Sequence, residues 1–159
     1  IPCQADILIS CSYPYDIDYW QCEKALISGY FAVKKGGIII LAAPCLEGLA
    51  HNHDDLLSWL GMSSEDAKAR LRHLWSSKEP GDLVSASIAI GAVTVREHAQ
   101  IFIYSQGLTD SEISAMGYRG FSSLQAAVDA ALAEKPDGVI GILKRGGDCL
   151  PLPVSLEER

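Results

Sequence analysis

The stretch that decides the fold is Ala5-Asp6-Ile7-Leu8-Ile9-Ser10, a short apolar run that stops at the turn-rich segment Cys11 to Asp16. Such a run is typical of a buried strand. From Tyr19 to Val33, large apolar residues recur at gaps of three and four, which is the spacing of one helix face. The next apolar run, Ile38 to Leu41, indicates a strand covered on both faces of a parallel sheet. The opening unit is therefore strand, helix, strand.

The rest of the chain continues this alternation. The patterns predict helices at 53–60, 63–77, 83–98, after Thr109 and from Ser122 to Glu134, and strands at 100–104 and 139–143. Right-handed crossovers place helices on both faces of such a sheet. We therefore expect an α/β fold: a Rossmann-like three-layer sandwich with a mostly parallel sheet of about four or five strands flanked by helices.

Composition narrows the class of protein. The 159 residues suit a single domain, and 48% hydrophobic with 21% charged residues is the balance of a folded globular chain. A net charge of -7 argues against nucleic acid as a partner. The longest apolar run, at 38–44, is far shorter than the roughly 20 residues of a membrane-spanning helix. We expect a soluble protein with neither nucleic-acid nor membrane partners.

The cysteines and the first residues indicate compartment and domain organisation. Five cysteines without a C-x-x-C pair predict reduced thiols and a cytoplasmic location. The sequence begins at Ile1, without a Met or a signal segment. We interpret residues 1–159 as a single α/β domain, the C-terminal domain of a longer two-domain protein.

In open parallel sheets, ligands bind beyond the carboxyl ends of the strands. The loops at 11–16, 44–53, 105–108 and 144–148 are therefore the places to look for a site. No Gly-x-Gly-x-x-Gly turn follows the first strand, so the pattern argues against a dinucleotide site. The glycine pairs at 36–37 and 146–147 are interpreted as a helix cap and a turn.

Gln21 and Lys24 are the candidate ligand-binding pair. They lie three residues apart in the first two turns of the first predicted helix, on the side away from its apolar stripe. Asp16 or Asp18 can cap this helix. Together with free N–H groups and the positive dipole of the helix start, an amide and an ammonium group can hold a carboxylate. The alternative is a solvated surface pair.

An apolar stripe of Trp20, Ile27 and Phe31 lies on the same outward side as Lys24. A solvent-facing helix does not normally carry such a stripe. Either a neighbouring helix covers it, or another domain docks over it and encloses the candidate pair in a cleft.

Histidines and cysteines supply weaker candidates. His51 and His53, next to two acidic residues, can be metal ligands, but solvated or capping roles are the simpler interpretation, and we predict no metal site. Cys11 and Cys45 each follow a predicted strand, so they are either reactive thiols near a helix start or core packing.

The first fifty residues contain a series of motifs. These are Ala5-Asp6-Ile7-Leu8-Ile9, Tyr13-Pro14-Tyr15-Asp16-Ile17-Asp18, Gln21-x-x-Lys24-Ala25-Leu26, Val33-Lys34-x-Gly36-Gly37-x-Ile39-Ile40 and Cys45-x-Glu47-Gly48. This series resembles the C-terminal domain of the lactate racemase family, which comprises nickel-pincer-nucleotide-dependent 2-hydroxyacid racemases and epimerases. The resemblance continues more weakly through the rest of the chain.

The resemblance implies a two-domain enzyme whose active site lies in the interdomain cleft. The N-terminal domain would hold the nickel-pincer nucleotide and the catalytic histidines, which act as acid and base during hydride exchange. The C-terminal domain would bind the substrate, and its Gln and Lys match Gln21 and Lys24 here. We expect Tyr13, Asp16 and Trp20 to line the same substrate site.

Two functions follow as hypotheses. The leading one is the substrate-binding C-terminal domain of a lactate-racemase-like enzyme, inactive alone, without catalytic residues or bound cofactor of its own. Its own N-terminal domain would dock over the face of Trp20, Ile27 and Phe31. The alternative is a non-catalytic small-molecule-binding or interaction module on the same fold.

Overall fold

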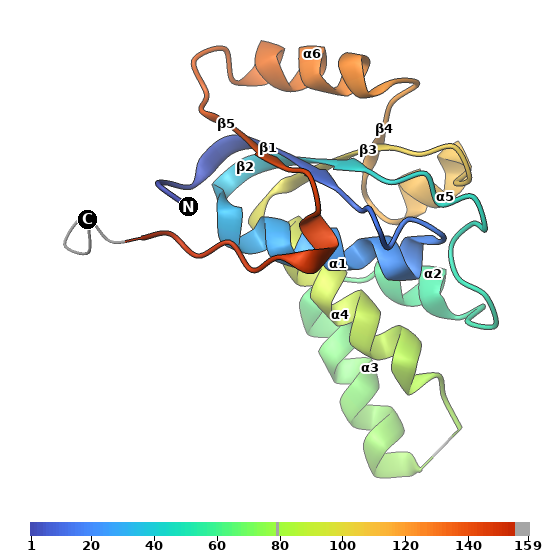
Figure 1. Ribbon diagram of the computed structural model, residues 1–159. Helices are drawn as coiled ribbons and strands as arrows, with labels where there is room; N and C mark the ends of the chain where they lie inside the picture. The colour runs from blue at the N-terminus through green and yellow to red at the C-terminus, as the bar shows by residue number, and fades with distance from the viewer. Residues whose placement is uncertain (79, 155–159) are drawn as a thin grey trace.

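The computed structural model describes residues 1–78 and 80–154 (Figure 1). Its five strands form one sheet of order β4-β3-β2-β1-β5, and every neighbouring pair is parallel. The strands are β1 Ala5–Cys11, β2 Val33–Ala42, β3 Gln100–Tyr104, β4 Arg119–Gly120 and β5 Ile140–Leu143. The helices are α1 Tyr19–Ala32, α2 Leu56–Leu60, α3 Ser64–Ser77, α4 Leu83–His98, α5 Asp110–Ala115, α6 Leu124–Glu134 and the short 3-10 helix η1 Gly146–Asp148. The predicted α/β class is confirmed.

Helices cover both faces of the sheet, as Figure 1 shows. Helix α6 packs on one face, where Ile38 and Ile40 of β2 meet its small residues. On the other face, Ile39 and Leu41 point into the larger core beneath α1 and α4. Alternate residues of one strand thus enter two separate cores, which explains the uninterrupted apolar run in β2.

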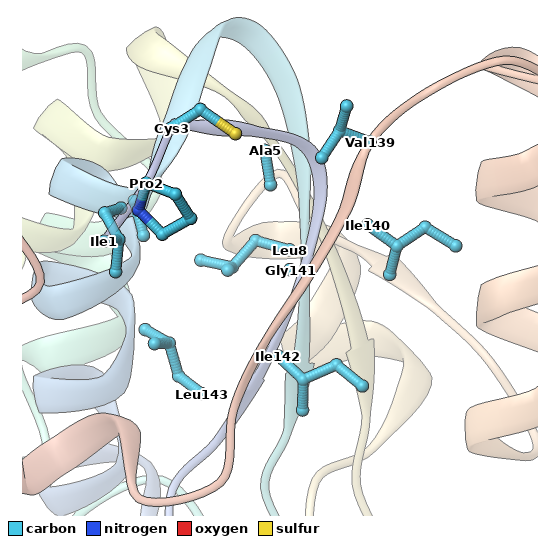
Figure 2. A pocket seen from close by; sticks show the side chains of 11 residues that line it. Ile1, Pro2, Cys3, Ala5, Leu8, Val139, Ile140, Gly141, Ile142 and Leu143 are labelled. Atoms are coloured by element: carbon cyan, nitrogen blue, oxygen red, sulfur yellow. The ribbon is translucent and has the colours of Figure 1, made fainter. Parts of the chain in front are cut away.

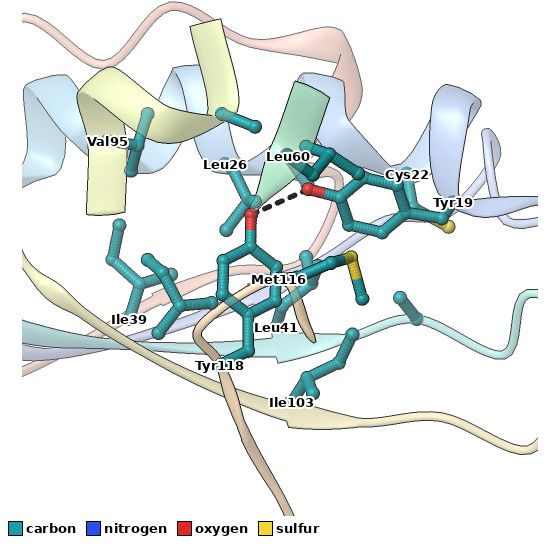
Figure 3. Packing of buried hydrophobic residues seen from close by; sticks show 14 of the residues in the cluster. Tyr19, Cys22, Leu26, Ile39, Leu41, Leu60, Val95, Ile103, Met116 and Tyr118 are labelled. Atoms are coloured by element: carbon teal, nitrogen blue, oxygen red, sulfur yellow. Dashed lines mark hydrogen bonds between the residues drawn. The ribbon is translucent and has the colours of Figure 1, made fainter. Parts of the chain in front are cut away.

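The larger core contains a pair of phenols (Figure 3). The hydroxyl groups of Tyr19 and Tyr118 lie 2.6 Å apart and form a buried hydrogen bond. Burial raises the pKa of both side chains above the ordinary tyrosine value. The pair joins the start of α1 to the segment before β4, which fixes the end of the helix that faces the candidate site.

Two local predictions are wrong, and one short strand was not predicted. Helix α1 ends at Ala32, and Gly36 lies inside β2, where its φ of +74° accompanies a register shift against β1 rather than a helix cap. Ser123, rather than Ser122, caps α6 through a hydrogen bond from the Ala126 N–H. The two-residue strand β4 was not predicted, because a strand that short has no periodicity.

The sheet edge at β5 carries exposed apolar side chains. Ile140 and Ile142 are 44% and 62% exposed. A pocket of about 230 Å³ lies beside this strand, lined by β5, β1 and residues 1–3 (Figure 2). Residues near the two ends lie together here, since the Ile1 amino group donates to the Leu152 carbonyl at 2.7 Å. None of the helices in the described ranges is long and apolar enough to cross a membrane.

Candidate functional site

The strand order creates one topological switch point. From β1 the chain moves to β2 and then outward to β3 and β4, but β5 returns to the other side of β1. The loops after β1 and β5 therefore meet above the carboxyl ends of neighbouring strands. Open α/β sheets bind ligands in this position.

The loop after β5 packs closely against the loop after β1. A Cβ atom on Gly147 would lie 2.6 Å from the ring of Tyr15, and one on Gly146 would lie 2.3 Å from Ser10 Oγ. Ser28 of α1 donates a hydrogen bond of 2.6 Å to the Cys149 carbonyl. The glycine pair therefore does more than turn the chain, because only residues without a side chain allow this approach.

The structure brings together the two predicted ligand-binding side chains. Lys24 Nζ donates a hydrogen bond to Gln21 Oε1. The same ammonium group lies 4.4 Å from the centre of the Tyr15 ring, a distance suited to a cation–π interaction. Lys24 is exposed and Gln21 is half-buried, so both remain within reach of a ligand.

Arg145 adds a second cation that sequence reasoning did not single out. Its guanidinium carbon lies 5.7 Å from the centre of the Tyr13 ring. Its Nε and Nη2 donate to Asp148 Oδ2 at 3.0 and 2.5 Å, and this interaction raises the pKa of Arg145. The sequence signal that could have identified Arg145 was its position in the loop after the last strand, which is one of the four loops at the carboxyl ends of the strands.

The expected contribution of the α1 N-terminus is wrong. Asp18 Oδ1 accepts from the Gln21 N–H at 2.8 Å, so Asp18 rather than Asp16 caps the helix. The N–H groups of Tyr19 and Trp20 donate to carbonyl groups of the loop after β2, at 3.0 and 3.1 Å. Because the first-turn donors have partners within the chain, an anion here depends on side chains.

Tyr13 and Asp16 lie in the loop between β1 and α1. Tyr13 is 54% exposed and faces Arg145 of the loop after β5. Asp16 is half-buried, and its carbonyl accepts from the Cys45 N–H at 3.1 Å. The two residues thus belong to the same loop, with Tyr13 at its surface and Asp16 tied to the loop after β2.

Trp20 is packed against the loop after β2 and the start of α4. Its ring meets His53 edge-on, with centroids 4.2 Å apart. His53 Nδ1 in turn lies 2.7 Å from Asp82 Oδ2, and Asp82 caps α4 through the Ser85 N–H. Although burial opposes it, hydrogen bonds from Ser85 and His53 hold the pKa of Asp82 at about 2. His53 thus has a structural role.

Helix α4 covers part of the outward stripe on α1. A Cβ atom on Gly91 of α4 would lie 3.1 Å from Ile27 Cδ1 and 2.7 Å from Glu23 Oε1. Ile27 and Phe31 stay half-buried and line an apolar groove of about 230 Å³ between the two helices. Helix α4 therefore covers one edge of the stripe, while the other edge borders the groove.

Glu23 is a buried carboxyl group that sequence reasoning missed. It lies between α1 and α4 and is only 5% exposed. Burial raises its pKa to about 7, although the nearby Lys24 acts in the opposite direction. Nothing in the sequence marked it, because an acidic residue next to a lysine on a helix is usually solvated.

No family model matches the chain. A segment of 63 residues is 36% identical to the lactate racemase of Thermoanaerobacterium thermosaccharolyticum, and it covers 38% of this chain and 14% of that enzyme. The structure of the lactate racemase apoprotein from the same organism matches 96% of this chain, with a TM-score of 0.75 and 21% identity. The resemblance to lactate racemases is confirmed.

A solved protein from Thermotoga maritima also shares the fold, with a TM-score of 0.56 and 14% identity over 94% of this chain. The chain spans 36% of the length of the racemase structure and 37% of the length of the Thermotoga protein. Both solved structures show the fold, and the 63-residue segment carries the relationship in sequence.

Within the part of the chain that the structure describes, the side chains do not provide a ligand set for a nickel ion. Over residues 1–78 and 80–154, no three His, Cys, Asp or Glu side chains converge as metal ligands would. His53 contacts Asp82, and His98 lies 3.2 Å from the Val33 carbonyl.

Proposed function

We propose that the chain is the substrate-binding C-terminal domain of a two-domain racemase or epimerase that acts on a small 2-hydroxyacid. Hydride exchange with a nickel-pincer nucleotide is assigned to the N-terminal domain, outside these residues. The proposal is supported by the relationship to lactate racemase and by the chemistry of the loops at the switch point.

The observation that carries the proposal is the Lys24 and Gln21 pair beside Tyr15. An ammonium group and an amide held together by a hydrogen bond offer several donors to one carboxylate. The Tyr15 ring under the ammonium group limits its freedom, so less entropy is lost when an anion binds. Arg145 lies on the same side of the loop and raises the local positive potential.

Trp20 supports the proposed site indirectly, by holding the helix that carries Gln21 and Lys24. It follows the helix cap and adjoins Gln21, and its contact with His53 fixes the first turn of α1 against α4. The groove beside α4 that the half-buried Ile27 and Phe31 line is the face over which we propose that the N-terminal domain docks. Docking there would bring a second domain over Lys24 and exclude water from the carboxylate.

The test is the rate of 2-hydroxyacid racemisation by the complete cofactor-loaded enzyme. Lys24→Ala should lower kcat/KM on the order of a hundredfold, because it removes a charge-assisted contact to the substrate. Lys35→Ala removes another exposed lysine, in β2, and should leave kcat/KM unchanged. An unchanged kcat/KM in Lys24→Ala would remove that lysine from the site.

A further inference from the structure

Two thiols meet in the core directly behind the candidate site. Cys22 lies next to Gln21 on α1, and Cys45 lies in the loop after β2. Their sulfur atoms are 3.4 Å apart, and both side chains are fully buried. They are adjacent in space although 23 residues separate them in sequence. The remaining cysteines of the chain are Cys3, Cys11 and Cys149, each partly or fully exposed.

The position of Cys45 is strongly constrained. Its N–H donates to the Asp16 carbonyl at 3.1 Å, and its own carbonyl accepts from Gly48 at 2.8 Å. Its φ of +48° is the left-handed conformation that residues with a side chain seldom adopt. A Cβ atom on Gly107 would lie 1.7 Å from the Cys45 carbonyl oxygen, so the opposite loop also holds it in place. Such a conformation persists only where the surroundings impose it.

The surroundings distinguish the two thiols chemically. The Cys45 S–H donates to Cys22 Sγ, and this hydrogen bond lowers the pKa of Cys22 despite burial. The same hydrogen bond and burial raise the pKa of Cys45. Cys22 therefore has the greater thiolate character, and Cys45 is the adjacent second thiol.

We propose that Cys22 and Cys45 form a redox-active dithiol that a small hydroperoxide converts to a disulfide. In the first step, the Cys22 sulfur attacks the peroxide, the O–O bond breaks, and Cys22 becomes a sulfenic acid as water or an alcohol leaves. In the second step, the Cys45 sulfur attacks Cys22 and the hydroxyl group leaves as water. The two sulfur atoms together lose two electrons, and the peroxide gains them.

Disulfide formation would move the candidate site. The sulfur atoms must approach from 3.4 Å to about 2.05 Å, so the first turn of α1 and the loop after β2 must shift together. The loop before α1 would follow, because Glu47 donates to the Ile17 carbonyl at 2.9 Å. A displacement of about 1 Å in a positioned group can lower activity about a hundredfold. Gln21 precedes Cys22 and would move with it. The expected loss of ligand binding through this movement rests on the proposed function, whereas the formation of the disulfide does not.

The disulfide is tested in the full chain carrying Cys3→Ser, Cys11→Ser and Cys149→Ser, which leaves the two buried thiols. After treatment with hydrogen peroxide, alkylation and trypsin, we expect the fragment that contains Cys22 and ends at Lys24 to be joined to the fragment 36–68 by a linkage that dithiothreitol breaks. If both thiols instead stay open to alkylation after unfolding, the dithiol is not redox-active. If Cys22 goes directly to a sulfinic acid while Cys45 stays reduced, the second step is wrong.

Two further comparisons complete the test. In the same background, Cys45→Ser should divert Cys22 to the sulfenic and sulfinic acids, and Cys22→Ser should leave Cys45 unoxidised.

Affinity for the 2-hydroxyacid should fall about a hundredfold in the disulfide form and return with dithiothreitol. If the disulfide forms but neither state binds the 2-hydroxyacid, the proposed function fails while the dithiol stands. Equal affinity in both states would overturn the coupling of the dithiol to the site.

Discussion

Lys24 lies over the ring of Tyr15, with its ammonium nitrogen 4.4 Å from the ring centre. The contact joins α1 to the loop after β1, so the lysine that we propose binds the ligand is positioned by a residue outside its own helix. Gly147 supports the same ring from the loop after β5. The start of α1, the loop before it and the sequence-distant loop after β5 thus determine where one positive charge lies.

The Tyr15 ring should therefore affect anion binding. Tyr15→Leu removes the cation–π contact, which is worth about 0.5 to 1 kcal/mol at exposed sites, and should weaken 2-hydroxyacid binding about two- to fivefold. Tyr15→Phe keeps the ring and should bind as the unmodified chain does. Calorimetric titration measures both. Equal affinities for the Leu and Phe variants would show that the ring does not position Lys24.

Arg145 should contribute a positive charge close to the bound carboxylate, which the neighbouring Lys144 should not. Arg145→Gln should lower the affinity for the 2-hydroxyacid about threefold at low salt, and the difference should shrink at high salt because the interaction is screened. Lys144→Gln is the matched control, since it removes the preceding exposed charge. Titrations at two ionic strengths measure the effect. A loss in Lys144→Gln of the same size would mean that net charge alone matters.

Glu23 should make the stability of the fold depend on pH. Its folded pKa of about 7 lies above the unfolded value of about 4.3, so the folded state holds an extra proton between these values. Stability therefore falls as pH rises through this window. Glu23→Gln should abolish the fall and raise the free energy of unfolding above pH 7 by roughly 3 kcal/mol.

Urea denaturation at pH 5 and pH 8 measures this effect. Glu65→Gln, in the exposed first turn of α3, is the control and should keep the pH dependence of the unmodified chain. A Glu23→Gln variant that loses stability at pH 8 would mean that the carboxylate has a partner that stabilises its charged form.

Asp82 should stabilise the contact between α1 and α4. Asp82→Ala removes the cap of α4 and the partner of His53, and should cost about 1 kcal/mol of unfolding free energy. Because His53 contacts the ring of Trp20, tryptophan fluorescence should change as well. Asp54→Ala, at an exposed position beside His53, should change neither. An unchanged fluorescence spectrum in Asp82→Ala would mean that Asp82 does not fix the position of His53 against Trp20.

Periodicity was sufficient to predict the layers of the fold. The runs at β1 and β2 and the spacing along α1 distinguish strand from helix, whereas at α4 the composition allowed either and the length of the segment favoured a helix. The bulge at Gly36 was not predictable, because glycine after a helix also fits a cap. Its geometry depends on β1, which is distant in sequence.

The candidate site was predictable in part. Gln21 and Lys24 share one helix, so their spacing alone placed them together. Arg145 and the thiol pair depend on contacts between distant segments, which no local pattern contains. Burial of Glu23 was missed for the same reason, since Gly91 of α4 creates the space that holds it.

The most direct measurement is a pair of calorimetric titrations of the complete protein, with lactate and with its neutral amide. If Gln21 and Lys24 hold a carboxylate, lactate binds and the amide does not, because the ammonium group of Lys24 has no anion to neutralise. Lys24→Ala should then abolish the preference for lactate, and Lys35→Ala should keep it. Equal binding of lactate and its amide, or a preference that survives Lys24→Ala, would contradict a carboxylate site at the start of α1.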